Sequence, residues 1–114
     1  MLTDASGIGG DTMVGGAGND TYIVTHSGDI IAESAGAGTD LVSANVSYAL
    51  ATNVEQLTLF GGSAITGTGN TGDNIITDNG AADTLVGLAG NDTYIVTNAS
   101  DIVTEALPPV LMWL

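Results

Sequence analysis

Gly15-Gly16-Ala17-Gly18-Asn19-Asp20-Thr21-Tyr22-Ile23 is the clearest copy of a nine-residue unit that recurs along this chain. Its sixth residue is acidic, its eighth residue is large and apolar, and glycines stand before the acid. Glycine accepts the positive φ angles and the close backbone approach that a tight turn needs, and the last three residues are of types that favour strands. The unit therefore predicts a tight turn followed by a very short strand whose middle side chain points inward.

The unit can be followed through two arrays. The first array consists of 6–14, 15–23, 24–32 and, after an insertion of Glu33 and Ser34, 35–43, and the second consists of 69–77, 78–86, 87–95 and 96–104. The sixth positions carry acidic or amide side chains: Asp11, Asp20, Asp29, Asp40, Asn74, Asp83, Asp92 and Asp101. The eighth positions are all apolar: Met13, Tyr22, Ile31, Val42, Ile76, Leu85, Tyr94 and Val103.

The two arrays also share an identical stretch of nine residues. Residues 11–33 align with 83–105, and residues 17–25 are identical to 89–97. One such short strand cannot bury its apolar face alone, whereas stacked coils create a continuous core between two parallel ladders. The sequence therefore predicts an all-β fold, a parallel β-roll or β-helix-like solenoid of short strands.

This organisation predicts one continuous solenoid in four parts. They are a first array at 1–43, a strand-rich spacer at 44–68, a second array at 69–105 and an irregular tail at 106–114. Within the spacer, residues 42–50 alternate between apolar and polar side chains, which predicts a single strand with one buried face. Residues 54–59 predict another strand, and we expect both to continue the stack or to cap it.

The end of the chain departs from the pattern at Pro108 and Pro109, which cannot donate ladder hydrogen bonds. Because the chain also begins close to a repeat, we expect it to be a fragment of a longer array. Further repeats, or a catalytic or adhesive domain, are then expected in the parent protein.

The charge balance restricts the partners of this chain. Its 114 residues include 13 acidic residues and no lysine or arginine, for a formal net charge of −13. Nucleic acids and anionic membrane surfaces are excluded as partners, because binding them requires cationic side chains. Repulsion among the carboxylates opposes compaction, so bound divalent cations are the simplest source of positive charge. Without cysteine, the chain has neither zinc-thiolate sites nor disulfides.

The nine-residue pattern resembles the RTX, or haemolysin-type, calcium-binding repeat, over residues 6–43 and 69–104. The resemblance implies that the glycine-rich turns bind calcium (Ca2+) between neighbouring coils, with oxygens from the sixth-position side chains and from the turn backbone. Calcium prefers such hard oxygen ligands in flexible geometry. The implied turn-backbone positions are Gly9, Gly16, Gly18, Gly72, Gly87 and Gly90.

Carried over to this chain, the resemblance pairs the sixth-position residues across neighbouring coils. The implied pairs are Asp11 with Asp29, Asp20 with Asp40, Asn74 with Asp92, and Asp83 with Asp101. An alternative stays open, in which some of these side chains only cap turns through local hydrogen bonds. Ala81 and Leu88 replace expected glycines, whereas asparagines such as Asn70 and Asn79 tolerate a left-handed backbone.

The resemblance implies a non-enzymatic calcium-binding module that folds on binding calcium and belongs to a secreted, extracellular protein. RTX proteins generally leave the cell by type I secretion, and an N-terminal signal peptide is not visible in this chain. Two alternatives remain: an accessory module at the C-terminus of a secreted hydrolase, such as a protease or lipase, and a spacer in a large surface adhesin. An upstream catalytic domain would favour the first, and dozens of further repeats the second.

Two weaker signals are discounted. The glycines at 67, 69 and 72 match a dinucleotide-binding fingerprint, but the residues that follow predict a strand rather than the required helix. His26 is the only histidine, which makes a turn residue a better interpretation than a zinc ligand.

Overall fold

The computed structural model describes residues 2–3, 10–34, 38–104 and 111–113, and these residues form strands and turns without a helix. None of them belongs to a helix long and apolar enough to cross a membrane. The strands are β1 (Leu2–Thr3), β2 (Thr12–Val14), β3 (Thr21–Val24), β4 (Ile30–Ala32), β5 (Leu41–Ala44), β6 (Tyr48–Ala49), β7 (Gln56–Leu59), β8 (Thr66–Thr68), β9 (Ile75–Thr77), β10 (Thr84–Val86), β11 (Thr93–Ile95), β12 (Ile102–Thr104) and β13 (Leu111–Trp113).

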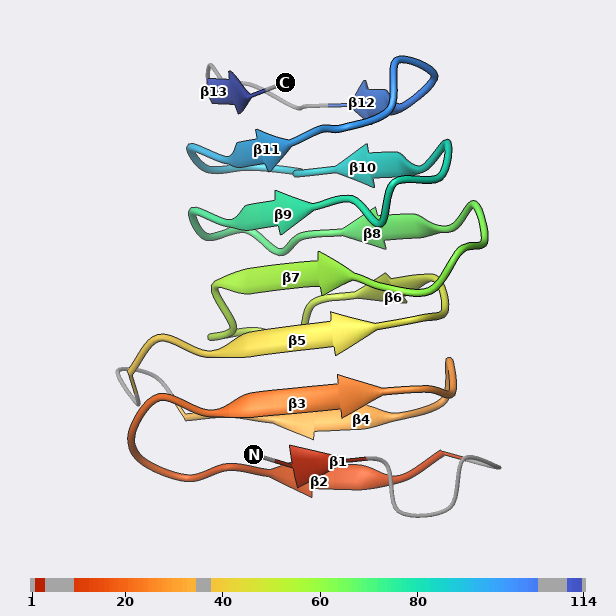
Figure 1. The fold of residues 1–114 in the computed structure, drawn as a ribbon. Coiled ribbons are helices and arrows are strands. Elements are labelled where there is room, and N and C mark those ends of the chain that lie inside the picture. The colour runs from red at the N-terminus through yellow and green to blue at the C-terminus, as the bar shows by residue number, and fades with distance from the viewer. Residues whose placement is uncertain (1, 4–9, 35–37, 105–110, 114) are drawn as a thin grey trace.

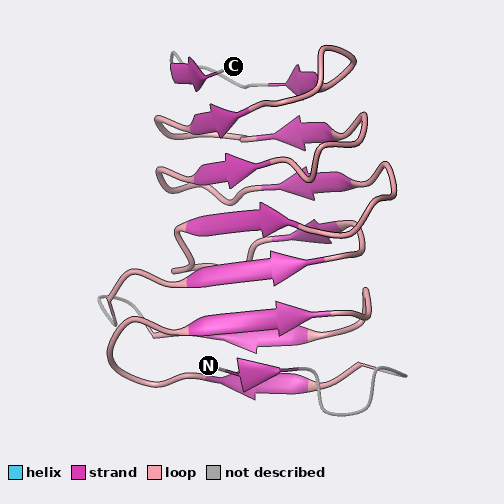
Figure 2. Ribbon diagram, viewed as in Figure 1, coloured by secondary structure: helices cyan, strands magenta, loops and turns pink. Residues whose placement is uncertain are grey.

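Successive strands alternate between two faces, so the chain winds as a stack of flattened coils (Figure 1). The described odd-numbered strands form one seven-stranded sheet in the order β1-β3-β5-β7-β9-β11-β13. The even-numbered strands lie on the opposite face, where the order is β2-β4 and β6-β8-β10-β12. All of these ladders are parallel, as the two layers in Figure 2 illustrate. The predicted all-β parallel β-roll is confirmed.

The core lies between the two faces and is built from the eighth positions of the repeat. Tyr22, Val42, Ile76, Leu85 and Tyr94 are fully buried there. Met13 and Ile31 are almost as well covered, and Val103 packs against the same cluster while partly exposed. Each coil contributes only one or two inward side chains per strand, so burial depends on the coils above and below.

The spacer residues form three strands that pair with their neighbours. β7 lies between β5 and β9, and β8 lies between β6 and β10. The strand predicted at 54–59 appears as β7, at Gln56–Leu59. Gly67 occupies the inward position of β8, where a Cβ atom would crowd Leu57 and Leu59 across the core. Those two leucines therefore fill the volume that the glycine leaves.

The prediction of a single strand at 42–50 is wrong. The chain turns at residues 45–47, so β5 and β6 belong to opposite faces. The alternation of burial nevertheless continues through the bend, from Val42 and Ala44 to Tyr48 and Leu50. The alternation of apolar residues indicates which side chains face the core. It does not distinguish a straight strand from a chain that bends around the core, because the alternation is the same in both.

The even-numbered face is interrupted where the odd-numbered face is continuous. Among the described residues, β4 pairs only with β2, and β6 pairs only with β8. The hydroxyl group of Tyr48 reaches across this break and donates a hydrogen bond of 3.4 Å to the carbonyl of Asp29. We call the junction between the coil of β3 and β4 and the coil of β5 and β6 the seam. Of the two faces, only the odd-numbered one carries a strand ladder across it.

Candidate functional site

The sixth-position side chains lie along two edges of the roll. Turns that lead into odd-numbered strands form one edge, here called the odd edge, and turns that lead into even-numbered strands form the even edge (Figure 1). The odd edge carries Asp20, Asp40, Asn74 and Asp92. The even edge carries Asp11, Asp29, Asp83 and Asp101. Each of these residues immediately precedes a strand, so the strand ladder fixes where its side chain lies.

All four pairs implied by the resemblance lie in contact across neighbouring coils. In every pair, the backbone N–H of the earlier residue donates to Oδ1 of the later one. The distances are 3.0 Å for Asp11 to Asp29, 2.8 Å for Asp20 to Asp40, 2.8 Å for Asn74 to Asp92 and 2.7 Å for Asp83 to Asp101. Some of these side chains also cap their own turns, as the local alternative expects: Asp29 accepts from His26, Asn74 from Asn70, Asp83 from Asn79 and Asp101 from Asn98.

Glu55 also lies on the odd edge, although the repeat frame does not include it. Glu55 precedes β7 as Asp40 precedes β5, and its Oε1 accepts the N–H of Asp40 at 2.9 Å. The local pattern could have revealed it, because Leu57 lies two positions downstream as the buried middle of a strand. Glu55 lies in the spacer, outside the nine-residue count, so the period does not predict it.

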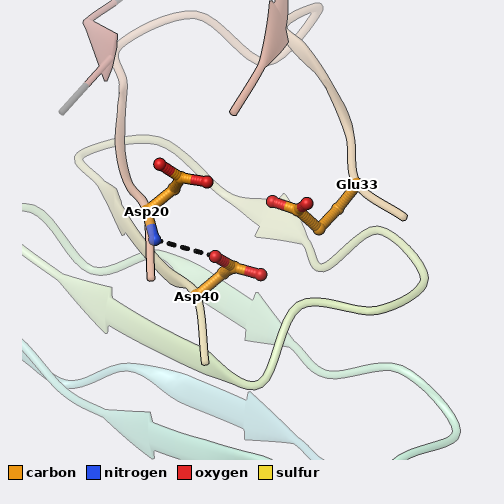
Figure 3. A group of neighbouring side chains, drawn as sticks. All are labelled: Asp20, Glu33 and Asp40. Carbon is orange, nitrogen blue, oxygen red and sulfur yellow. Dashed lines mark hydrogen bonds between the residues drawn. The ribbon is translucent and has the colours of Figure 1, made fainter. Parts of the chain in front are cut away.

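One group of carboxylates on the odd edge has two oxygens without hydrogen-bond donors among the described residues. Oxygens of Asp20, Glu33 and Asp40 lie within 4.8 Å of one another (Figure 3). Oδ2 of Asp20 and Oδ2 of Asp40 are buried and have no hydrogen-bond partner among the described residues. Burial, together with the nearby carboxylates of Glu33 and Glu55, raises the pKa of Asp40 above its ordinary value. A buried carboxylate surrounded by carboxylates is costly unless a cation accompanies it.

A second group, on the even edge, consists of Asp78, Asp83 and Asp101, with oxygens again within 4.8 Å of one another. Here the oxygens have donors. Asp78 accepts from the backbone and hydroxyl of Thr97, and Asp83 accepts from Ile65 and Asn79. Asp78 stands at a first position of the repeat and was not predicted as a site residue.

The pKa values of this second group are linked. Burial tends to raise the pKa of Asp78, but hydrogen bonds from Asp101 and Thr97 outweigh it and lower that pKa below its ordinary value. Burial and the same contact with Asp78 raise the pKa of Asp101. The contact between Asp78 and Asp101 therefore moves their pKa values apart.

The chain is similar in sequence to known proteins. Residues 6–22 and 66–103 match the RTX calcium-binding nonapeptide repeat, in four copies. The chain carries RTX calcium-binding repeats. It is also 39% identical, over 74 residues, to endo-1,3-1,4-beta-glycanase ExsH of Rhizobium meliloti (strain 1021), a match that spans 65% of this chain and 16% of that relative. No solved structure matches.

The donor set of the RTX roll fits calcium. Carboxylate oxygens of Asp20, Glu33 and Asp40, and of Asp78, Asp83 and Asp101, lie close together, and the backbone carbonyls of some turns lie against the next turn. A Cβ atom at Gly38 would lie 2.6 Å from the carbonyl oxygen of Gly18, and one at Gly90 would lie 2.5 Å from that of Gly72. The carbonyl of Gly87 similarly faces Gly69. Such hard oxygens suit calcium, which takes six to eight of them.

The implied turn-backbone glycines differ in role within the RTX turns. Gly16, Gly18 and Gly90 have positive φ angles of 80°, 100° and 99°, respectively, whereas Gly72 does not fall in that region. Gly9 lies outside the described residues. Leu88 takes a positive φ of 66° in the place of a glycine, a conformation that costs a non-glycine residue about 1 kcal/mol.

The expectation of left-handed backbone at Asn70 and Asn79 is wrong, since neither has a positive φ among the described residues. Their side chains instead join neighbouring coils. Nδ2 of Asn70 donates to the carbonyls of Ala51 and Val54, and its Oδ1 accepts from Gly72. Asn79 repeats this arrangement on the even edge. His26 is a turn residue of the same kind, whose Nδ1 accepts the N–H of Gly28 at 2.9 Å.

Proposed function

We propose that this chain is a calcium-binding β-roll module of a longer, secreted protein, and that it completes its folding when it binds calcium. The observation that carries the proposal is the wholly buried side chain of Asp40, whose Oδ2 has no hydrogen-bond donor among the described residues. The sequence contains no lysine or arginine that could neutralise it. A bound metal ion is then the remaining source of positive charge, and the RTX repeats favour calcium.

Calcium would act by mass action. An ion that binds only the folded roll stabilises the roll, and the stabilisation grows with the logarithm of the ratio of the ion concentration to Kd. Extracellular calcium modules bind with Kd values of about 10⁻⁴–10⁻³ M. A chain of this kind stays unfolded where free calcium is scarce and folds outside the cell. RTX repeat proteins are typically secreted, and we propose the same for the parent protein, by a type I route.

The test is a calcium titration of the whole chain, followed by far-ultraviolet circular dichroism, with magnesium as the matched control. We expect a transition from coil to β structure in the high-micromolar to millimolar range (roughly 10⁻⁴–10⁻³ M), and none with magnesium. Magnesium is a suitable control because it has the same charge as calcium but demands near-ideal octahedral geometry and gives up water reluctantly. A chain that is already β-rich in chelator and does not respond to calcium would contradict folding on calcium.

A second candidate concerns the parent protein rather than the module. The glycanase relative favours an accessory module of a secreted hydrolase that acts on polysaccharide, with the enzyme lying beyond these residues. The repeats themselves form a non-catalytic module. The test is to assay the full product of the parent gene on mixed-linkage β-glucan, in calcium and in chelator. Calcium-dependent hydrolysis would support this candidate, whereas a product made mainly of further repeats would favour the adhesin spacer.

A further inference from the structure

Glu33 enters the odd edge through an insertion. It follows the unit at 24–32 and precedes the unit at 35–43, so it belongs to neither nine-residue frame. The insertion lengthens its coil, because Tyr22 pairs with Val42 at a distance of 20 residues along the chain, whereas regular coils repeat every 18. It also falls outside the residues that match the RTX repeat. Its counterpart in the second array, Glu105, lies outside the described residues.

The Glu33 carboxylate is held toward Asp20 and Asp40. Tyr22, whose ring lies in the core, donates its hydroxyl hydrogen to Oε2 of Glu33 at 2.7 Å. The backbone N–H of Ser34 donates to Oε1 at 3.2 Å. Nδ2 of Asn53, in the next turn of the odd edge, donates to the Glu33 carbonyl at 3.2 Å. Three hydrogen bonds therefore fix this residue, and Figure 3 shows its side chain extending toward the two aspartates.

Gly15 lets the backbone pass close to this group, because it has no side chain. A Cβ atom at Gly15 would collide with Oδ2 of Asp20 and with the Tyr22 hydroxyl. Oδ2 of Asp20 and Oδ2 of Asp40 are buried without a hydrogen-bond partner among the described residues, and Asp40 is 0% exposed. In the group on the even edge, by contrast, N–H and hydroxyl donors contact the corresponding oxygens.

We propose that Asp20, Glu33 and Asp40 together hold one calcium-sized cation, with Glu33 as a third carboxylate ligand supplied by the insertion. This rests on the proposed calcium-binding function and extends it to a site of higher charge. Affinity for calcium in oxygen sites rises with the number of charged ligands. The site therefore fills before the two-residue pairs of the regular repeats. Because Asp20 and Asp40 precede β3 and β5, the ion ties together the two coils that meet at the seam.

The first experiment measures calcium binding by the full chain and by the variant Glu33→Gln, in competition with a chromophoric chelator. The variant keeps the shape of the side chain and removes one charge. Its matched control is Asp73→Asn, which removes one charge from an exposed carboxylate on the same edge. We expect Glu33→Gln to weaken the tightest binding step by roughly tenfold or more and Asp73→Asn to leave it nearly unchanged. Equal isotherms for the two variants would overturn the proposal.

The second experiment uses terbium(III), an oxygen-seeking stand-in for calcium whose emission is sensitised by a nearby tyrosine. The Tyr22 hydroxyl is hydrogen-bonded to the proposed ligand, so its ring lies beside the ion. We expect Tyr22→Phe to lose most of the emission that appears with the first equivalent of terbium, while the calcium stoichiometry stays the same. Full emission from Tyr22→Phe would place the first ion elsewhere and refute the proposal, even if Glu33→Gln proved unable to fold.

The two proposals fail in different ways. If the unmodified chain binds no calcium, the proposed function itself is wrong. If it binds calcium but Glu33→Gln and Asp73→Asn behave alike, only the third ligand is wrong. Circular dichroism of each variant in saturating calcium separates a lost ligand from a lost fold.

Discussion

The burial of the Asp40 carboxylate is the main unfavourable electrostatic feature of this fold. Asp40 is wholly buried, its Oδ1 accepts the N–H of Asp20, and its Oδ2 has no donor among the described residues. Burying an ionised carboxylate costs several kcal/mol unless charge or hydrogen bonds compensate it. The residue therefore destabilises the ion-free roll and would stabilise the roll once a cation is bound.

The substitution Asp40→Asn should separate these two effects. Its amide oxygen can still accept from Asp20, and its amide nitrogen can donate to the carboxylates around it. In chelator we expect the free energy of unfolding to rise by about 1–2 kcal/mol, and in calcium we expect it to fall below that of the unmodified chain. Denaturant unfolding under both conditions measures this, with Asp73→Asn as control. A loss of stability in chelator would contradict it.

The pKa of Asp40 also predicts how the ion-free roll responds to pH. Its folded value lies above the ordinary 3.8, so its contribution to stability is fully present below 3.8 and is lost as pH rises through the folded value. Asp101 acts in the same direction. Asp78, with a lowered pKa, acts oppositely, but only as pH falls below 3.8. In chelator, acidification toward pH 3.8 should therefore raise the melting temperature.

In calcium the same acidification should lower the melting temperature, because protons compete with the ion for the carboxylates. Thermal unfolding across this range, in chelator and in calcium, gives the two slopes. Slopes of the same sign would indicate that the carboxylates do not hold the ion.

At the scale of the turns, glycine is required where neighbouring coils touch. Gly90 has a φ of 99°, and a Cβ atom there would lie 2.5 Å from the carbonyl oxygen of Gly72. Gly16 has a similar φ of 80°, but nothing lies within 4 Å of its Cβ position. The two positions therefore separate the cost of the backbone conformation from the cost of the contact between coils.

We expect Gly16→Ala to cost about 1 kcal/mol for the left-handed backbone, and Gly90→Ala to cost about 1–3 kcal/mol more for the displaced turn. Gly62→Ala, at a site with neither constraint, should be neutral or slightly stabilising. The measurement is the free energy of unfolding in saturating calcium. Equal losses at Gly16 and Gly90 would mean that the turns can separate without cost.

The regular repeats made the fold predictable. The inward residues followed from the nine-residue period, because a parallel stack places equivalent residues next to one another, and the cross-coil pairs followed from the resemblance to the RTX repeat. The nine-residue period says nothing about residues that lie outside the repeat units, such as those of an insertion or of the spacer. Glu33 and Glu55 therefore escaped prediction, although both join the odd edge. The bend within 42–50 escaped for another reason, because burial alternates equally along a straight strand and around a corner.

At the scale of the whole molecule, the folded chain has a Cα radius of gyration of 13.2 Å and carries a net charge of −13. An unfolded chain of this length has a radius of gyration of about 34 Å. Charge repulsion favours the expanded state, and monovalent salt only screens it.

Small-angle scattering should therefore distinguish screening from binding. We expect an expanded chain in chelator at low salt, a partial contraction in sodium chloride, and full contraction only in calcium. A chain that is equally compact in chelator and in calcium would show that its packed core alone overcomes the repulsion.

The seam has a mechanical consequence. If the two ends of the stack are pulled apart, every junction between coils carries the same tension, and the weakest one opens first. Among the described residues, no ladder joins β4 to β6 and the Tyr48 hydrogen bond crosses between them, whereas the junctions on either side of the seam have a strand ladder on both faces. An ion held by Asp20, Glu33 and Asp40 would cross-link the two coils at the seam. The extension at which the roll yields would then depend on the calcium around it.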